Sequence, residues 1–453
     1  MFPTAARRPL RLQPLVFGDI DEEPLKQDIK GVLGDLVVFL PSIRVEGMLD
    51  PDLVTRIPGE ADVLLPLTTE QIVPSKGLRV DKAFQLEPLK LLDKPIFLWA
   101  EGGYYSPWNK AALVYLRLRG AEVYEFLEPS EAVEIARALR TRVRMRGAKV
   151  LYFGEITDIT GLPQFADIFG SDWNLERLER TWGVTVKQVR IQEIIDLMEK
   201  IPAEAVEREY GFWKESIVDM GPASLRELCE VIRLYLAMEH ILREQRADAF
   251  TINCLGDLLR KRFLPPCLAL SRFNDEGIVA GCEGDLNALI TMMILRYTTD
   301  EPAIMGNLYP FRAERGPGFP PPEIRLSDTR QFFRENRARL THDVIPLSLA
   351  GGKCVLQRYH GTDKGLVPYA DLPEGTVTLA RLGPTINRLV VTVAQVEKVE
   401  NTIHCSFSLY LKFKDLKEYI RQSAGVHAVV SYGSHLKTLK RVADSVGIEF
   451  VQV

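Results

Sequence analysis

Apolar residues in the first third of the chain fall into short runs, which are separated by patterns with helical spacing. Strands that alternate with helices in this way are typical of a parallel sheet. We therefore predict an α/β domain over residues 1–146. Its expected strands are LRLQPLVFG, GDLVVFLPS, ADVLLPL and KPIFLWAEG, and its expected helices are NKAALVYLRLRG and SEAVEIARALRTRVRMRG.

A second alternating block covers residues 147–302, where we predict a further α/β domain. One helix in this block has a clear start, because Ser224 precedes a periodic run and Glu227 follows at the spacing of a capping box. The expected strands are AKVLYFGEI, GVTVKQVRI, ADAFTINC and LPPCLALSRF.

The pattern changes after the glycine- and proline-rich loop AERGPGFPPPE, and we assign residues 303–453 to a β-rich C-terminal domain. No long helix separates its first five apolar stretches, so we predict a mostly antiparallel sheet or barrel. These stretches are DVIPLSLAG, KCVLQRYH, GTVTLARL, NRLVVTVAQVEKV and TIHCSFSLYLKF. The chain then closes with a strand, a helix and a strand: GVHAVVSYG, SHLKTLKRVADSVG and IEFVQV.

Composition excludes several classes of protein. A chain of 453 residues is too long for one hydrophobic core, and its net charge of -4 offers no basic field for nucleic acid. No apolar window is long enough to span a membrane, and the N-terminus lacks the apolar region of a signal peptide. The six cysteines are spread singly without a CxxC pair, which argues against structural zinc and disulfides. We therefore expect a cytoplasmic protein.

Several well-known catalytic motifs are absent from the sequence. It contains no P-loop, no GxGxxG between a strand and a helix, no HExxH and no GxSxG. Their absence argues against a P-loop NTPase, a typical dinucleotide enzyme and a serine hydrolase.

Candidate chemistry lies in the segment GIVAGCEGDLNALITMMILRYTTDEPAIMGNL, residues 277–308. Its apolar spacing predicts a helix that begins just after Asp285, which is a good N-cap residue. Glu283 would then lie in the turn at the carboxyl edge of a strand, where open α/β sheets bind ligands. Taken alone, the two acids could be no more than a helix cap and a favourable contact with the helix dipole, which is the simpler interpretation.

An aromatic segment in the first domain, WAEGGYYSPWNKAALVYL, is a second candidate. Aromatic faces beside polar groups suit sugar rings, and a loop between a strand and a helix is a plausible binding site. Packing at a subunit interface explains the same residues equally well. The candidates for substrate binding here are Trp99, Tyr104, Tyr105 and Trp108.

The stretch CEGDLNALITMMILRYTTDEPAIMGN opens a helix with an E-x-D motif, and AGVHAVVSYGSHLKTLKRVADSVGIEFVQV closes the chain. Both resemble segments of the L-fucose isomerase and L-arabinose isomerase superfamily. The run LPPCLALSRFNDEGIVAGC before the motif resembles the fucose-isomerase-like branch in particular. In that superfamily the closing unit carries a histidine metal ligand on its first strand.

The resemblance implies two Rossmann-like α/β domains followed by a β-rich C-terminal domain, which is the plan predicted above. It also implies a Mn²⁺-dependent aldose–ketose isomerase that acts on a monosaccharide and assembles into a homo-oligomer, often a hexamer. Residue by residue, Glu283 is implied as metal ligand and acid/base, and His427 as metal ligand. The superfamily's second acid falls on Asn307.

Asn307 departs from the superfamily's pattern in a way that affects the chemistry. Isomerisation through an enediol moves one proton from C2 to C1 and another between O1 and O2. The carbonyl of an asparagine can coordinate a hard cation, but its amide cannot exchange a proton in this way. An inactive or altered sugar-binding homologue, or an enzyme with another sugar reaction such as epimerisation, therefore stays open beside the isomerase.

Other side chains are weaker candidates for the same site. Asp285 shares a face with Glu283 if the segment is extended, although the N-cap role competes for it. His360 follows a strand and lies beside a glycine, as a loop-borne ligand or substrate contact would. His342 and His404 are lesser candidates, and Asp300 and Glu301 are expected to be exposed loop acids.

Overall fold

The computed structural model describes residues 8–17, 20–45, 52–68, 72–73, 78–79, 93–99, 107–154, 175–310, 326–402, 405–423 and 425–453. The chain divides into two compact units, which we call the N-terminal unit (residues 8–143) and the C-terminal unit (residues 144–453).

The N-terminal unit is built around a parallel sheet, as its alternating pattern predicted. The strand order is β2-β1-β4-β7-β8, and β3 also pairs with β1. The strands are β1 (Leu10–Phe17), β2 (Val37–Phe39), β3 (Ile43–Val45), β4 (Val63–Thr68), β7 (Ile96–Phe97) and β8 (Val123–Tyr124), and the main helices are α1 (Glu23–Leu33), α4 (Pro107–Arg117) and α5 (Pro129–Met145).

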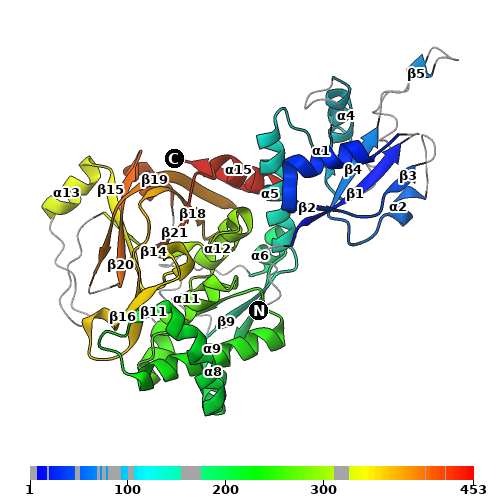
Figure 1. The fold of residues 1–453 in the computed structure, drawn as a ribbon. Coiled ribbons are helices and arrows are strands. Elements are labelled where there is room, and N and C mark those ends of the chain that lie inside the picture. Colours follow the sequence, from blue (N-terminus) through cyan, green and yellow to red (C-terminus); the bar gives the residue numbers. More distant parts are fainter. Residues whose placement is uncertain are drawn as a thin grey trace. The chain divides into compact units, whose positions relative to one another are not determined.

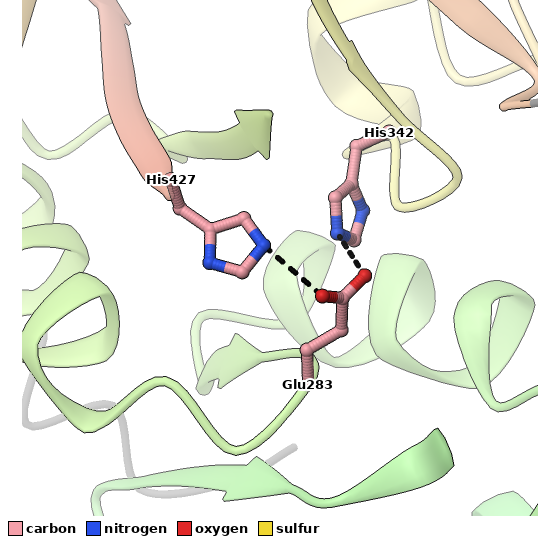
Figure 2. Close-up of side chains that lie close together, drawn as sticks. All are labelled: Glu283, His342 and His427. Carbon is pink, nitrogen blue, oxygen red and sulfur yellow. Dashed lines mark ion pairs between the residues drawn. The ribbon is translucent and has the colours of Figure 1, made fainter. Parts of the chain in front are cut away.

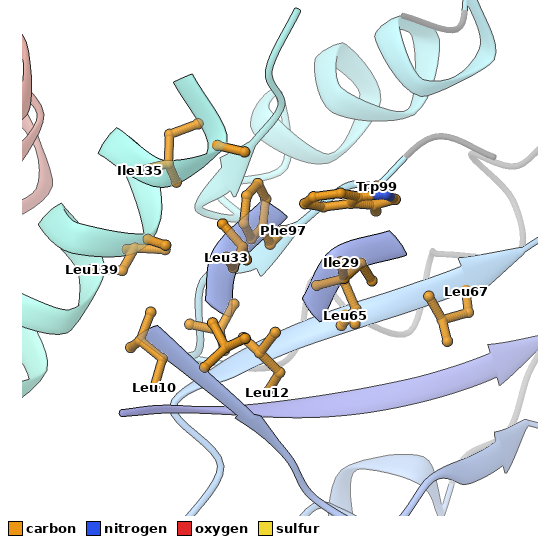
Figure 3. Close-up of a cluster of buried hydrophobic side chains, with 14 of the residues drawn as sticks. Leu10, Leu12, Ile29, Leu33, Leu65, Leu67, Phe97, Trp99, Ile135 and Leu139 are labelled. Atoms are coloured by element: carbon orange, nitrogen blue, oxygen red, sulfur yellow. The ribbon is translucent and has the colours of Figure 1, made fainter. Parts of the chain in front are cut away.

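Both faces of this sheet are buried. Leu10 and Leu12 of β1 belong to one hydrophobic cluster, together with Ile135 and Leu139 of α5 (Figure 3). Leu15 of β1 belongs to the cluster that contains α4 residues. Burial on both faces explains why these strands are continuous apolar runs and do not alternate with polar residues.

The first half of the C-terminal unit contains a second parallel sheet, with strand order β10-β9-β12-β13. Its strands are β9 (Lys149–Phe153), β10 (Thr185–Val189), β12 (Ala249–Ile252) and β13 (Val279–Gly281). The capping box predicted at Ser224 and Glu227 is confirmed at the start of α9. The helices are α6 (Leu175–Trp182), α7 (Ile191–Met198), α8 (Ala203–Ser216), α9 (Leu225–Gln245), α10 (Leu259–Arg262), α11 (Cys267–Asp275) and α12 (Leu286–Thr299).

The strand predicted at LPPCLALSRF was wrong, because this segment forms α11, which begins after Pro266. Seven of its nine residues are buried, so it lacks the polar face that would reveal a helical period. Two polar side chains are accommodated by bonds to the preceding turn, from Ser271 Oγ to Cys267 O and from Asn274 Nδ2 to Leu270 O.

The second half of the C-terminal unit is a mainly antiparallel sheet, with order β18-β21-β14-β15-β20-β19-β22. Because β18 also pairs with β19, the sheet closes on itself, which confirms the predicted antiparallel barrel. Figure 1 shows these strands wrapped beside α12. The strands are β14 (Ile304–Tyr309), β15 (Arg337–His342), β18 (Gly375–Leu382), β19 (Arg388–Asn401), β20 (Phe407–Phe413), β21 (His427–Tyr432) and β22 (Glu449–Gln452).

The stretch DVIPLSLAG, which was expected to be a strand, is not one. DVIPLSLAG contains the short 3-10 helix η6 (Leu347–Ala350), which follows Pro346, and the preceding residues form β15 instead. A small sheet of β11 (Ile217–Asp219), β16 (Cys354–Arg358) and β17 (Leu366–Tyr369), and the helices α13 (Leu326–Arg334), α14 (Leu416–Gln422) and α15 (Leu436–Val446), complete the unit.

Helix α12 links the parallel sheet to the barrel. It packs against β12 and β13 on one side and against β18 and β21 on the other. All of its residues from Leu286 to Thr298 are buried. The turn before α12 therefore faces the ends of barrel strands.

The bounds of the three predicted domains stay predictions, and the loop 313–323 lies outside the described residues. Among the helices that the structure describes, none has the length and apolar character that crossing a membrane requires.

Candidate metal centre

Glu283 lies in the tight turn that joins β13 to α12. Its φ is 56°, and the next residue, Gly284, has a φ of 67°. Such values are uncommon for a residue with a side chain and are often found at functional sites. A Cβ on Gly284 would overlap the Tyr152 hydroxyl, so the turn requires glycine there. The backbone therefore fixes the direction in which Glu283 projects.

Two barrel strands bring histidines to this carboxylate. His427 begins β21 and His342 ends β15, and both strands pair with β14, which lies between them. His427 Nε2 lies 3.2 Å from Glu283 Oε2, and His342 Nε2 lies 3.6 Å from Glu283 Oε1. Figure 2 shows the two rings directed at the carboxylate from two strands.

These three side chains fit a divalent metal ion. Their ligand atoms lie within 4.8 Å of one another. Neither His342 Nε2 nor His427 Nε2 meets the geometry of a hydrogen bond with any described residue, although both atoms are buried. Buried nitrogen atoms normally have a partner, and two imidazoles with one carboxylate suit ions such as Mn²⁺, Fe²⁺ and Zn²⁺. The Glu283 side chain is 19% exposed, so a ligand can reach the centre.

The same geometry shifts the charges of the group. Burial of Glu283 opposes its ionisation, but the neighbouring His427 and His342 outweigh burial and hold the pKa of Glu283 below its ordinary value. Burial likewise opposes the charge on His427, but Glu283 and Asp285 raise its pKa to about 9. His427 therefore carries a proton in the metal-free protein, and a metal ion that binds must displace it.

Asp285 is confirmed as the N-cap of α12, because its Oδ1 accepts from the Ala288 N–H at 2.8 Å. Its other oxygen, Oδ2, lies 2.9 Å from His427 Nδ1 and 2.9 Å from Arg381 Nη1. Burial raises the pKa of Asp285, but Arg381 and His427 outweigh burial and lower it overall. Asp285 is therefore ionised and lies behind His427, on the side opposite Glu283.

Asn307 lies beside His427 in the sheet. The two residues are opposite each other in the antiparallel pair of β14 and β21. Side chains at opposing positions leave the same face of a sheet, so the amide lies on the side to which His427 points. Its roles in catalysis and metal binding stay predictions.

His360 lies in a second group of ligand-type side chains. Its Nε2 is 3.2 Å from Asp343 Oδ2, and Cys405 completes a group whose ligand atoms lie within 4.8 Å of one another. Asp343 Oδ1 also accepts from the Ser406 N–H at 2.7 Å. Burial raises the pKa of the Cys405 thiol, which keeps it protonated. This group lies next to the centre in sequence, because Asp343 follows His342. Substrate contact by His360 stays a prediction.

The aromatic candidates belong to the N-terminal unit or lie outside the described residues. Trp99 is buried in the core of that unit, packs on Phe97 and Phe126, and donates to Asp28 Oδ2 at 2.8 Å. These contacts account for it as a packing residue, and sugar binding stays a prediction. Trp108 lies in α4, whereas Tyr104, Tyr105 and His404 lie outside the described residues.

Two acids near Asn307 do not join the centre. Asp300 is the C-cap of α12 and pairs with Arg144, at 3.1 Å between Oδ1 and Nη1. Glu301 is exposed, as expected from its loop position.

His342 is the residue that sequence reasoning ranked too low. No strand was expected at RARLTH, so nothing placed this histidine beside His427. The available signal was a histidine at the end of a short alternating stretch, directly before Asp343. Only the pairing of β14 with both β15 and β21 brings the two histidines together.

Comparisons with known proteins agree with this geometry in part. Residues 176–300, about a quarter of the chain, match the model of the L-arabinose isomerase central domain. This segment contains Glu283 and Asp285 but ends before Asn307, His342 and His427.

Two curated relatives are sulfoquinovose isomerases, from Priestia aryabhattai and from Priestia megaterium. Each is 24% identical over 226 residues, which are 48% of this chain and 50% of the relative. The chain thus spans about half the length of the curated relatives it matches. Together the matches support an arabinose/fucose isomerase-like superfamily.

Proposed function

We propose that this protein is a divalent-metal-dependent aldose–ketose isomerase acting on a monosaccharide, in the fucose-isomerase-like branch of its superfamily. The observation that carries the proposal is the convergence of Glu283, His342 and His427, with two buried Nε2 atoms directed at one carboxylate. The similarity to sugar isomerases supports the reaction class. Assembly into a homo-oligomer remains part of the proposal.

In this proposal the ion is held by Glu283, His342 and His427, and Mn²⁺ is the ion expected. A bound divalent ion would supply Lewis-acid stabilisation of negative charge on the sugar oxygens. Asn307 lies on the same face as His427 and would offer its carbonyl as a neutral ligand or as a hydrogen-bond partner.

Glu283 is the proposed base. Its neighbours keep it ionised, so one oxygen can accept the proton from C2 and return it to C1. In the same conversion the hydroxyl proton of O2 passes to O1, which completes the change from aldose to ketose. The two histidines flank the carboxylate, with Nε2 of His427 at 3.2 Å and Nε2 of His342 at 3.6 Å. The enclosed position of the centre limits access of water to the carbanion-like intermediate.

A metal titration followed by an activity panel tests the proposal. Calorimetry with Mn²⁺ should give one ion per chain for the natural protein. Glu283→Gln and His342→Gln should each weaken binding about tenfold or more, because the first replaces a charged ligand with a neutral one and the second removes an imidazole. The matched control is His240→Gln, because His240 is exposed on α9 and should leave binding unchanged.

The panel contains arabinose and sulfoquinovose, which occur in the names of the similar proteins, and fucose, which the sequence resemblance suggests. Conversion is followed by NMR in deuterated water, and deuterium should enter at C1 or C2. Absence of divalent-ion binding by the natural protein would overturn the metal-dependent mechanism, as would full activity in Glu283→Gln. Metal binding without any conversion would favour the sugar-binding homologue, and deuterium at another carbon would favour an epimerase.

A further inference from the structure

A buried carboxylate and a buried guanidinium lie behind His427, on the side away from Glu283. His427 Nδ1 is 2.9 Å from Asp285 Oδ2, and Arg381 Nη1 is 2.9 Å from the same oxygen. The side chains of His427 and Arg381 are 1% exposed, and that of Asp285 is 5% exposed. The three groups come from β21, the turn before α12, and β18.

Asp285 divides its two oxygens between two tasks. Oδ1 accepts from the Ala288 N–H and caps α12, whereas Oδ2 faces both His427 and Arg381. Because a carboxylate only accepts, the nitrogen that faces it must carry the proton. His427 Nδ1 therefore carries a proton, and in the metal-free protein Nε2, which faces the Glu283 carboxylate, carries one as well. A metal ion that binds at Nε2 replaces the proton there, whereas Nδ1 keeps its proton for Asp285.

The fold makes specific room for Arg381. A Cβ on Gly425, two residues before His427, would overlap the Arg381 guanidinium. Gly425 also has a φ of 101°, which disfavours any other residue. Burying a guanidinium costs solvation free energy unless the group is paired. A buried apolar side chain would avoid this cost, so packing alone does not explain the pair of Arg381 and Asp285.

We propose that Asp285 and Arg381 are positioning residues that hold the His427 ring with Nε2 directed at Glu283, and that they thereby set the affinity of the centre for a divalent ion. The inference rests on the proposed metal site. Arg381 acts indirectly: it holds the Asp285 carboxylate in place, and the carboxylate holds the His427 ring in place. Metal-bound histidines commonly depend on such partners, whose removal weakens metal binding about 10- to 100-fold.

Asp285→Asn is the sharpest perturbation. Asparagine is also a good N-cap, so its Oδ1 can keep the bond to Ala288 and α12 should stay intact. Its Nδ2 then faces Arg381 and His427 as a donor, which favours the ring form that accepts at Nδ1 and carries its proton on Nε2. That form cannot bind a metal through Nε2.

The experiment measures the Mn²⁺ dissociation constant by calorimetry for the full-length natural protein and its variants. Asp285→Asn should raise it about 10- to 100-fold and Arg381→Met about tenfold, and Arg381→Lys should recover part of the loss because the charge is retained. Thermal unfolding without metal shows whether each variant folds.

Arg144→Met is the matched control. Arg144 is also a buried arginine, and it pairs with Asp300 at the opposite end of α12, within the same unit. This variant should lower the unfolding temperature and leave the dissociation constant unchanged. An unchanged constant in Asp285→Asn, or an equal loss in Arg144→Met, would overturn the inference.

Crystal structures of metal-free Asp285→Asn and Arg381→Met supply a readout that does not need the metal. If the natural protein binds no divalent ion, the proposed function fails in its metal-dependent form, but the positioning role is still decided. A His427 ring turned away from Glu283 in these variants would support positioning, and a ring that keeps its place in both would overturn it.

Discussion

Removing the charge of Glu283 should lower the pKa of His427. In the metal-free protein Glu283 is the largest cause that raises this pKa, ahead of Asp285, and together they overcome burial to bring it from 6.5 to about 9. That rise corresponds to about 3 kcal/mol of preference for the charged ring. In Glu283→Gln only Asp285 opposes burial, so a large part of that preference should be lost.

The consequence for stability has a definite sign. The pKa of His427 is higher in the folded than in the unfolded chain, so the charged ring stabilises the fold fully below about pH 6.5. This contribution disappears as the pH rises from 6.5 through about 9. In Glu283→Gln the loss should be complete at a lower pH, because the folded pKa is closer to the unfolded one.

The assay is an NMR titration of the ring protons in metal-free protein. The chain has six histidines, and the His427 signal is assigned by its absence in His427→Gln. Glu301→Gln is the matched control, since Glu301 is an exposed acid and should leave the titration unchanged. A His427 pKa that stays near 9 in Glu283→Gln would refute the reasoning and would assign the shift to Asp285.

Three further predictions concern the centre and the core. Asn307→Asp places a carboxylate opposite His427, with about 5 Å between the Cα atoms of the two residues, and should tighten Mn²⁺ binding by a few kcal/mol. An unchanged dissociation constant in calorimetry would show that position 307 does not face the ion. Gly284→Ala should cost about 1–3 kcal/mol in denaturant unfolding and weaken metal binding, because the new methyl group overlaps the Tyr152 hydroxyl; full stability would contradict the turn geometry. Leu12→Ala, at a fully buried position of the N-terminal unit, should lower the free energy of unfolding by about 2–5 kcal/mol and leave the Mn²⁺ dissociation constant unchanged. Weaker Mn²⁺ binding in this variant would contradict a centre whose affinity does not depend on the core of the N-terminal unit.

Local patterns were sufficient for much of the secondary structure. The continuous apolar runs predicted the parallel strands, and the Ser224 and Glu227 spacing predicted the start of α9. The same reasoning placed Asp285 at the N-cap of α12, because capping depends on residues within one helical turn. It failed at α11, where burial on all sides removes the polar face on which a periodicity argument depends.

The sequence by itself determined that Glu283 lies in a strand-to-helix turn and that His427 lies in a strand, because both follow from short-range patterns. Only the tertiary structure decided which residues meet them. His342 reaches Glu283 because β15 and β21 both pair with β14, and Arg381 reaches Asp285 because β18 lies beside α12. Pairing between strands that are distant in the chain depends on the packing of the whole unit, so no local pattern contains it.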